Sequence, residues 1–188
     1  MKKHFFPAAI LAVSVLAVGG ATQAQTTAAP PPQVPASANK LDSEDRGFLS
    51  DAAQSGHLEI EGSKLALEKS ANADVKKFAQ TMINDHTEVG QKLAVLAKSK
   101  GYEPPTEPSL VQSAKLKALG LRDEGFDKAY SGEIGVSAHE EAVKLFENAS
   151  REAKDPEVKK FAADTLPNLK HHLEQAKALQ QGVESKAK

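Results

Sequence analysis

The sequence predicts an all-α protein built as an antiparallel four-helix bundle. From about residue 43 onward, apolar residues recur at spacings of three and four over four long stretches, the period of a helix with one buried face. No stretch alternates apolar and polar residues as a half-buried strand would. The motif Val75-Lys-Lys-Phe-Ala79 recurs as Val158-Lys-Lys-Phe-Ala162, each just after a predicted helix junction. We therefore expect two similar helical hairpins packed together.

The N-terminus has the order of a secretory signal peptide over residues 1–24. Two lysines precede an apolar run at 8–18, which is shorter than the ~20 residues that a transmembrane helix needs. Thr22-Gln-Ala24 predicts cleavage after Ala24, while Gly19-Gly-Ala21 offers a second cleavage site. We therefore expect export to the periplasm or cell envelope with no transmembrane anchor after cleavage; a retained signal anchor is the alternative.

Residues 25–40 contain four prolines and no apolar period, which is typical of an exposed, disordered linker. The folded domain is expected at 41–182, and a disordered tail at 183–188. Because the chain has no cysteine, it has no disulfide, thiolate ligand or cysteine nucleophile. Its 24 basic and 25 acidic residues form no dense basic patch, which argues against nucleic-acid binding, and the sequence identifies no protein partner.

The first hairpin is expected to consist of a helix over 43–70 and a second one that ends near residue 99. Both begin at residues that favour helix N-termini, which are Asp42 or Ser43 and Asn72 or Asp74. Prolines exclude a helix at 102–109, and a short extra helix at 110–119 completes a long crossover to the second hairpin.

The second hairpin is expected to consist of a third and a fourth helix. The third begins at Asp123 and runs to about Glu152, although three glycines weaken its first turns. Asp155 caps the fourth helix, Pro156 is its first residue, and the helix ends at Gln181 before a glycine.

Each predicted long helix carries one ionisable residue on its apolar stripe. In chain order these are Glu59, His86, His139 and His172. In each hairpin we count the residues between the helix junction and the ionisable residue of each helix, at a rise of 1.5 Å per residue. The two distances along the helices differ by about 5 Å or less. His57 and His171, in contrast, fall on polar faces. The four inward residues are therefore expected to converge on one layer of the bundle.

We expect these four residues to bind one divalent transition metal, Zn²⁺, Cu²⁺ or iron, and we expect no other cofactor. Imidazole and carboxylate are ligands for these ions, and bundle cores commonly hold such sites. The alternative is a metal-free network of buried hydrogen bonds in a structural or stress-protective protein. The sequence contains no phosphate-binding glycine loop, G-x-S-x-G or H-E-x-x-H motif, so it indicates no enzymatic reaction.

From 41 to 179 the sequence resembles the exported bacterial proteins grouped as domain of unknown function 4142. The resemblance rests on an ordered set of motifs: Phe48 to Gly56, Glu59, Lys64-Leu-Ala66, Val75-Lys-Lys-Phe-Ala79, Asp85-His86, Phe126-Asp127 with Tyr130, His139-Glu140, and Thr165 to His172. It implies export and a ferritin-like helical bundle. It implies no established activity.

The ferritin-like class suggests a di-iron site, but the sequence departs from that pattern. Such sites use Glu-x-x-His on two helices, whereas Ile83, Val136 and Leu169 stand three residues before the histidines. Asp85 and Glu140 adjoin histidines, yet a one-residue offset turns each about 100° away along its helix. A di-iron enzyme is therefore disfavoured, and a mononuclear metal site remains.

Overall fold

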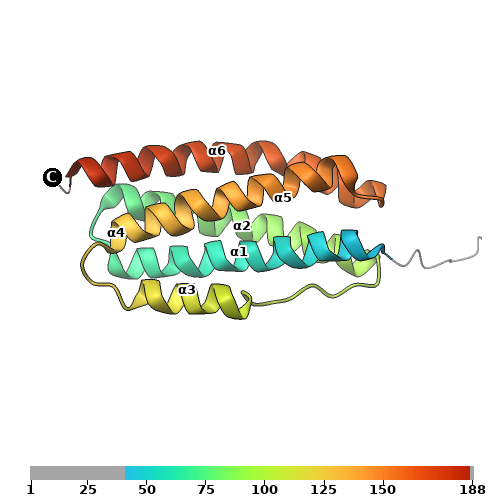
Figure 1. Ribbon diagram of the computed structural model, residues 1–188, viewed down its shortest axis with the longest axis horizontal. Coiled ribbons are helices and arrows are strands. Elements are labelled where there is room, and N and C mark those ends of the chain that lie inside the picture. Colours follow the sequence, from blue (N-terminus) through green and yellow to red (C-terminus); the bar gives the residue numbers. More distant parts are fainter. Residues whose placement is uncertain (1–40, 187–188) are drawn as a thin grey trace, which may run out of the picture. The chain divides into compact units, whose positions relative to one another are not determined.

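The computed structural model describes residues 41–186, and every regular element within them is helical (Figure 1). The all-α prediction is therefore confirmed for this part of the chain. The signal peptide predicted at 1–24 and the linker predicted at 25–40 lie outside the described residues, as do the last two residues of the predicted tail. No helix within 41–186 is long and apolar enough to cross a membrane.

The first hairpin follows the sequence closely. Helix α1 (Ser43–Lys69) begins where the Asp42 side chain accepts a hydrogen bond from the backbone N–H of Glu44. Helix α2 (Ala73–Ser99) begins in the same way, because Asn72 accepts from the backbone N–H of Asp74. These bonds satisfy donors that a helix start otherwise leaves unpaired.

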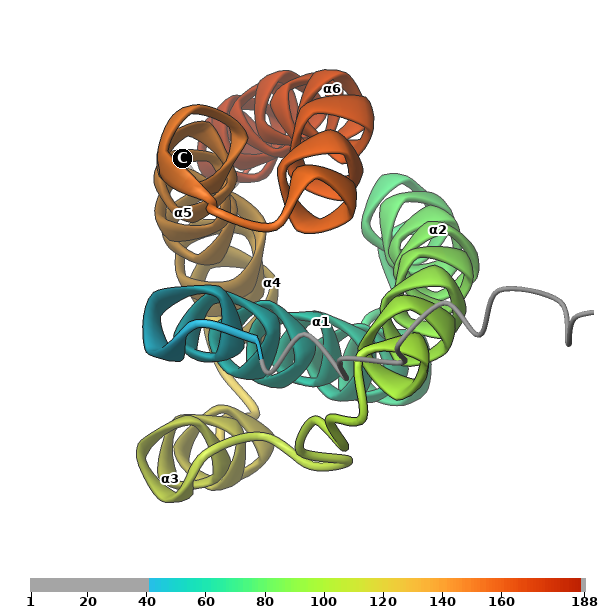
Figure 2. The ribbon, with the colours of Figure 1, turned by 90° about the vertical axis from the view of Figure 1, so that its right-hand side faces the viewer.

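The crossover contains the short helix that the sequence predicts. Helix α3 (Leu110–Gly120) opens with a capping box, in which the side chains of Ser109 and Gln112 each accept a hydrogen bond from the backbone N–H of the other residue. It packs against α1 on the side away from the other long helices (Figure 2).

The third predicted helix is not uniform, and its predicted start at Asp123 is wrong. Gly125 adopts a left-handed φ of 66°, so the chain turns there and the helix begins as α4 (Phe126–Ala129). A π-helix, η1 (Tyr130–Ser137), follows, and α5 (Ala138–Glu152) completes the element. Gly135 brings η1 close to α6, since a Cβ on it would lie 3.3 Å from the Cβ of Ala176.

Helix α6 (Pro156–Lys186) begins as predicted but continues beyond Gln181. At its start, the Asp155 side chain accepts hydrogen bonds from the backbone N–H groups of Glu157 and Val158. Gly182 stays helical because Val183, the next residue, is buried in the apolar core, and this burial favours continuing the helix. The predicted disordered tail at 183–188 is therefore wrong as far as residue 186.

The long helices α1, α2, α5 and α6 surround a common interior, with α1 packed on α2 and α5 on α6 (Figure 2). Two apolar clusters fill this interior. One includes Phe48, Leu93 and Phe146, and the other includes Met82 and Tyr130. Along each long helix, the ionisable residue stands between members of the two clusters: Glu59 after Ala53, His86 after Met82, His139 after Ala138, and His172 after Leu169.

Candidate metal centre

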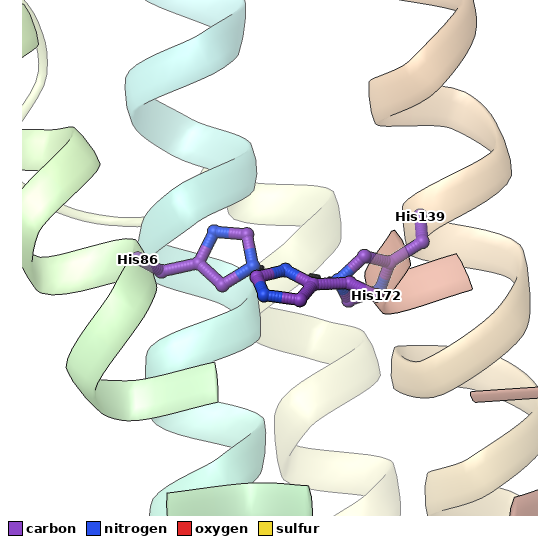
Figure 3. Close-up of side chains that lie close together, drawn as sticks. All are labelled: His86, His139 and His172. Carbon is purple, nitrogen blue, oxygen red and sulfur yellow. Dashed lines mark hydrogen bonds between the residues drawn. The ribbon is translucent and has the colours of Figure 1, made fainter. Parts of the chain in front are cut away.

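Three histidines from three helices point toward one another in the interior (Figure 3). His86 comes from α2, His139 from α5 and His172 from α6, and each is at most 3% exposed. One ring nitrogen of each lies within 4.8 Å of those of the other two. The structure thus brings together the three histidines that the sequence places on apolar stripes, and their role as metal ligands stays a prediction.

The π-helix positions His139. Nδ1 of His139 lies 2.8 Å from the carbonyl oxygen of Gly135 and 3.3 Å from that of Ile134. A carbonyl oxygen only accepts, so Nδ1 carries the proton and donates it. A neutral His139 therefore has its lone pair on Nε2, which lies 3.4 Å from Nε2 of His86.

Glu59 lies against both His86 and His139. Its Oε2 is 3.0 Å from Nδ1 of His86, whereas the other nitrogen of that ring, Nε2, faces His139. Its Oε1 is 3.6 Å from Nδ1 of His139 and has no hydrogen-bond partner. Glu59 thus contacts the outer ring nitrogens, and the group of mutually close nitrogens consists of the three imidazoles.

Asp85 orients His172, a contact that the sequence analysis missed. Nε2 of His172 donates a hydrogen bond to Oδ2 of Asp85 at 2.9 Å, and the Asp85 side chain is 37% exposed. The one-residue offset that turns Asp85 away from the stripe of α2 turns it toward α6, which an analysis of each helix alone does not reveal. The other nitrogen of His172, Nδ1, is buried and has no hydrogen-bond partner.

Burial keeps the three imidazoles neutral at neutral pH. Desolvation lowers the pKa of His86 well below its ordinary value, and the charges of His139 and His172 would lower it further. Desolvation is also the main reason that the pKa of His139 falls to about 4. It lowers the pKa of His172 as well, although the hydrogen bond to Asp85 opposes that shift.

The carboxyl group of Glu59 responds to burial in the opposite direction. Desolvation raises the pKa of Glu59 to about 8, so this side chain is mostly protonated at pH 7. The protonated carboxyl donates from Oε2 to Nδ1 of His86, and the Nε2–H of His86 then donates to the lone pair of His139. Buried polar groups are normally paired, yet Oε1 of Glu59 and Nδ1 of His172 remain outside this chain of bonds.

The spacing of His86 and His139 fits a transition-metal site, and a ring nitrogen of His172 lies within 4.8 Å of both. Nitrogen ligands about 2.0 Å from a tetrahedral metal lie about 3.3 Å from each other, close to the 3.4 Å between Nε2 of His86 and Nε2 of His139. The other nitrogen of each ring has a partner of its own. His86 contacts the carboxyl group of Glu59, His139 the backbone carbonyl of Gly135, and His172 the carboxylate of Asp85. Such contacts are the ones that orient metal-binding histidines.

Comparisons with known proteins agree with this helical architecture. The model of the family described as Domain of unknown function (DUF4142) matches residues 30–179, whereas no curated protein matches the chain. The solved structure of CopM in the Cu(II)-bound form is 19% identical and has a TM-score of 0.62, covering 73% of this chain and 96% of that one. CopM in the Cu(I)-bound form is 21% identical with a TM-score of 0.63 and the same coverage.

A further solved structure shares the architecture. A DUF305 fragment from Deinococcus radiodurans is 15% identical and has a TM-score of 0.65, covering 75% of this chain and 97% of that one. At such identities, the similarity shows a shared helical fold.

Proposed function

The chain belongs to the DUF4142 family, and we propose that it binds one copper ion through His86, His139 and His172. The observation that carries this proposal is the buried Nδ1 of His172, which has no hydrogen-bond partner and belongs to a ring in a group of three close imidazoles. Neutral imidazoles are good ligands for copper, zinc and iron. The copper-bound forms of the structurally similar CopM favour copper among these metals.

In this proposal Glu59 orients His86 and does not coordinate the metal. The ligand set therefore differs from the four-residue set that the sequence predicts. Glu59 contacts the outer nitrogen of His86, as Asp85 contacts the outer nitrogen of His172. When bound, copper supplies a Lewis-acidic cation, and the three residues supply lone pairs from His86 Nε2, His139 Nε2 and His172 Nδ1.

The proposal is tested by the copper content of the purified protein. We expect about one copper per chain, by elemental analysis and by titration of chelator-treated protein against a chromophoric chelator that competes for copper. The alternative is a structural protein whose buried polar residues bind no metal. The 3.0 Å contact between Oε2 of Glu59 and Nδ1 of His86 favours this alternative, because it pairs these two groups without a metal. Copper content at background level would reject copper binding and leave this structural alternative.

Copper binding is expected to release about one proton per ion at pH 7. Before binding, the carboxyl proton of Glu59 and the Nε2–H of His86 are both in place, because the pKa of Glu59 is raised to about 8. For Nε2 of His86 to offer its lone pair, the ring must carry its proton on Nδ1 and donate it to the Glu59 carboxylate. One proton therefore leaves the centre, and the release should fall toward zero well above pH 8.

This proton release is measured by calorimetric copper titrations in buffers of different ionisation enthalpy. Glu59→Gln should abolish the release at pH 7, since the amide oxygen accepts from Nδ1 of His86 without losing a proton. Glu61→Gln is the matched control, because Glu61 lies on α1 with an exposed side chain paired to Lys64. An unchanged proton count in Glu59→Gln would show that the proton comes from another group.

We also propose the finer architecture and the location that the sequence predicts. The pairs α1–α2 and α5–α6, joined through α3, support a ferritin-like antiparallel four-helix bundle with a long crossover. The order of basic, apolar and small residues in 1–24 supports a cleaved signal peptide, a linker at 25–40 and a location in the periplasm or cell envelope.

A further inference from the structure

A cavity of about 560 Å³ lies between α1 and α2 and reaches the candidate metal centre. Exposed residues line its outer part: Gln91, Lys98, Glu103 and Thr106. Buried residues from four helices line its inner part, among them His86 of the three-histidine group. Two other hollows in the described part of the chain, one beside Phe78 and one beside Asp85, are lined by none of the three histidines. The cavity between α1 and α2 therefore connects a proposed copper ligand with solvent.

Two glycines keep this cavity open. Gly56 of α1 and Gly90 of α2 both line it, and a Cβ on either residue would meet no atom within 4 Å. Neither glycine has a left-handed φ, and neither lets another element approach closely, so the usual reasons for a glycine are absent. Glycine destabilises a helix interior relative to alanine. The space that both glycines leave between the helices explains their presence there.

Two imidazoles of different exposure line the cavity. His57 is half-buried, whereas His86 is 3% exposed. Imidazole is a ligand for copper, so His57 can hold the ion nearer to solvent before it reaches His86. The cavity has room for a hydrated ion, because its volume is many times the ~30 Å³ that one water molecule occupies. The two rings therefore form a path of copper ligands from the half-buried wall to the interior.

We propose that copper enters and leaves the centre through this cavity, and that His57 binds the ion in transit. This inference rests on the proposed copper centre and gives it an access route. A residue on the route changes the barrier for entry and the barrier for exit equally. It therefore changes the association and dissociation rates by the same factor and leaves the affinity for copper unchanged. The affinity tests the centre, and the two rates test the route.

The test is a stopped-flow measurement of Cu²⁺ uptake by the full protein after treatment with a chelator. Cu²⁺ quenches tyrosine fluorescence, and the chain has two tyrosines, Tyr102 and Tyr130, and no tryptophan. Tyr102 lines the cavity, so its emission responds to an ion that passes through. The release rate is measured by transfer of bound copper to an excess of a chromophoric chelator.

Leucine at either glycine should obstruct the cavity. Gly56→Leu is expected to slow both uptake and release at least about tenfold, while the copper content stays at about one ion per chain. Gly90→Leu fills the cavity from the opposite wall and should slow both rates in the same way. Gly47→Leu is the matched control, since Gly47 is also on α1 with open space at its Cβ and lies outside the cavity. Its rates should stay within about twofold of the wild type.

His57→Ala is expected to slow uptake and release at least about threefold, because the ion loses a ligand on its path. His171→Ala is the control for this variant, since His171 is exposed and lies outside the cavity. Unchanged rates in both Gly56→Leu and Gly90→Leu would overturn the access route, and unchanged rates in His57→Ala would remove His57 from it. Copper at background level in the wild type would reject the centre as well, whereas one copper per chain with unchanged rates rejects the route alone.

Discussion

Replacing His172 by alanine is expected to lower the affinity of the protein for copper by at least about a hundredfold. His172 is 1% exposed and its Nε2 is held by Asp85, so Nδ1, which is buried and has no hydrogen-bond partner, is the nitrogen left to bind a metal. No other imidazole in the described part of the chain belongs to this group, and the loss would leave two ligands. Competition with a chromophoric copper chelator at pH 7 measures the change.

The neighbouring histidine provides the matched control. His171 is exposed on α6, where its ring nitrogen contacts Gln175, so His171→Ala should leave copper affinity within about twofold of wild type. His57→Ala should behave in the same way, because His57 is absent from the group of three. If His171→Ala and His172→Ala lose affinity equally, copper binds outside the bundle interior and the proposed centre is wrong.

Replacing Asp45 by alanine is expected to destabilise the protein by about 2–4 kcal/mol. Asp45 is 2% exposed, and its two carboxylate oxygens accept hydrogen bonds from the backbone N–H groups of Lys154 at 3.0 Å and Asp155 at 2.7 Å. Alanine leaves both donors without this partner at the junction between α5 and α6. Thermal unfolding followed by circular dichroism should show a midpoint roughly 5–12 °C lower.

Asp51→Ala controls for the loss of a negative charge on the same helix. Asp51 is exposed on α1, so its replacement should change stability by less than about 0.5 kcal/mol. Equal stability of the Asp45→Ala and Asp51→Ala proteins would show that the long-range bonds of Asp45 contribute nothing to the free energy of unfolding.

Much of the helical structure follows from local chemistry, which explains where the sequence succeeded. Asp42 and Asn72, each one of the two residues expected at its helix start, and Asp155 cap their helices, because capping involves only the next few residues. The errors arose where distant contacts dominate. Gly182 predicts the end of a helix, yet the helix continues to Lys186 because Val183 is buried in the core.

For the candidate site, the sequence predicts which residues face the interior but not the hydrogen bonds that orient them. The apolar stripes identified the three inward histidines, since helix periodicity determines which side of a helix is buried. Periodicity does not determine which nitrogen of a ring points inward or which neighbouring helix supplies its partner. Asp85 and the carbonyl of Gly135 hold His172 and His139 only because of contacts between helices and the π-helical geometry.

The buried polar layer, formed by Glu59, His86, His139 and His172, also bears on local unfolding. It separates the two apolar clusters, so each long helix contributes apolar residues to one cluster on one side of the layer and to the other cluster on the other side. The side chains that meet in the layer are one carboxyl group and three imidazoles, whereas those within each cluster are apolar. A fluctuation that exposes one core can therefore leave the other buried, and the two ends can behave as separate cooperative units with different amide-exchange protection.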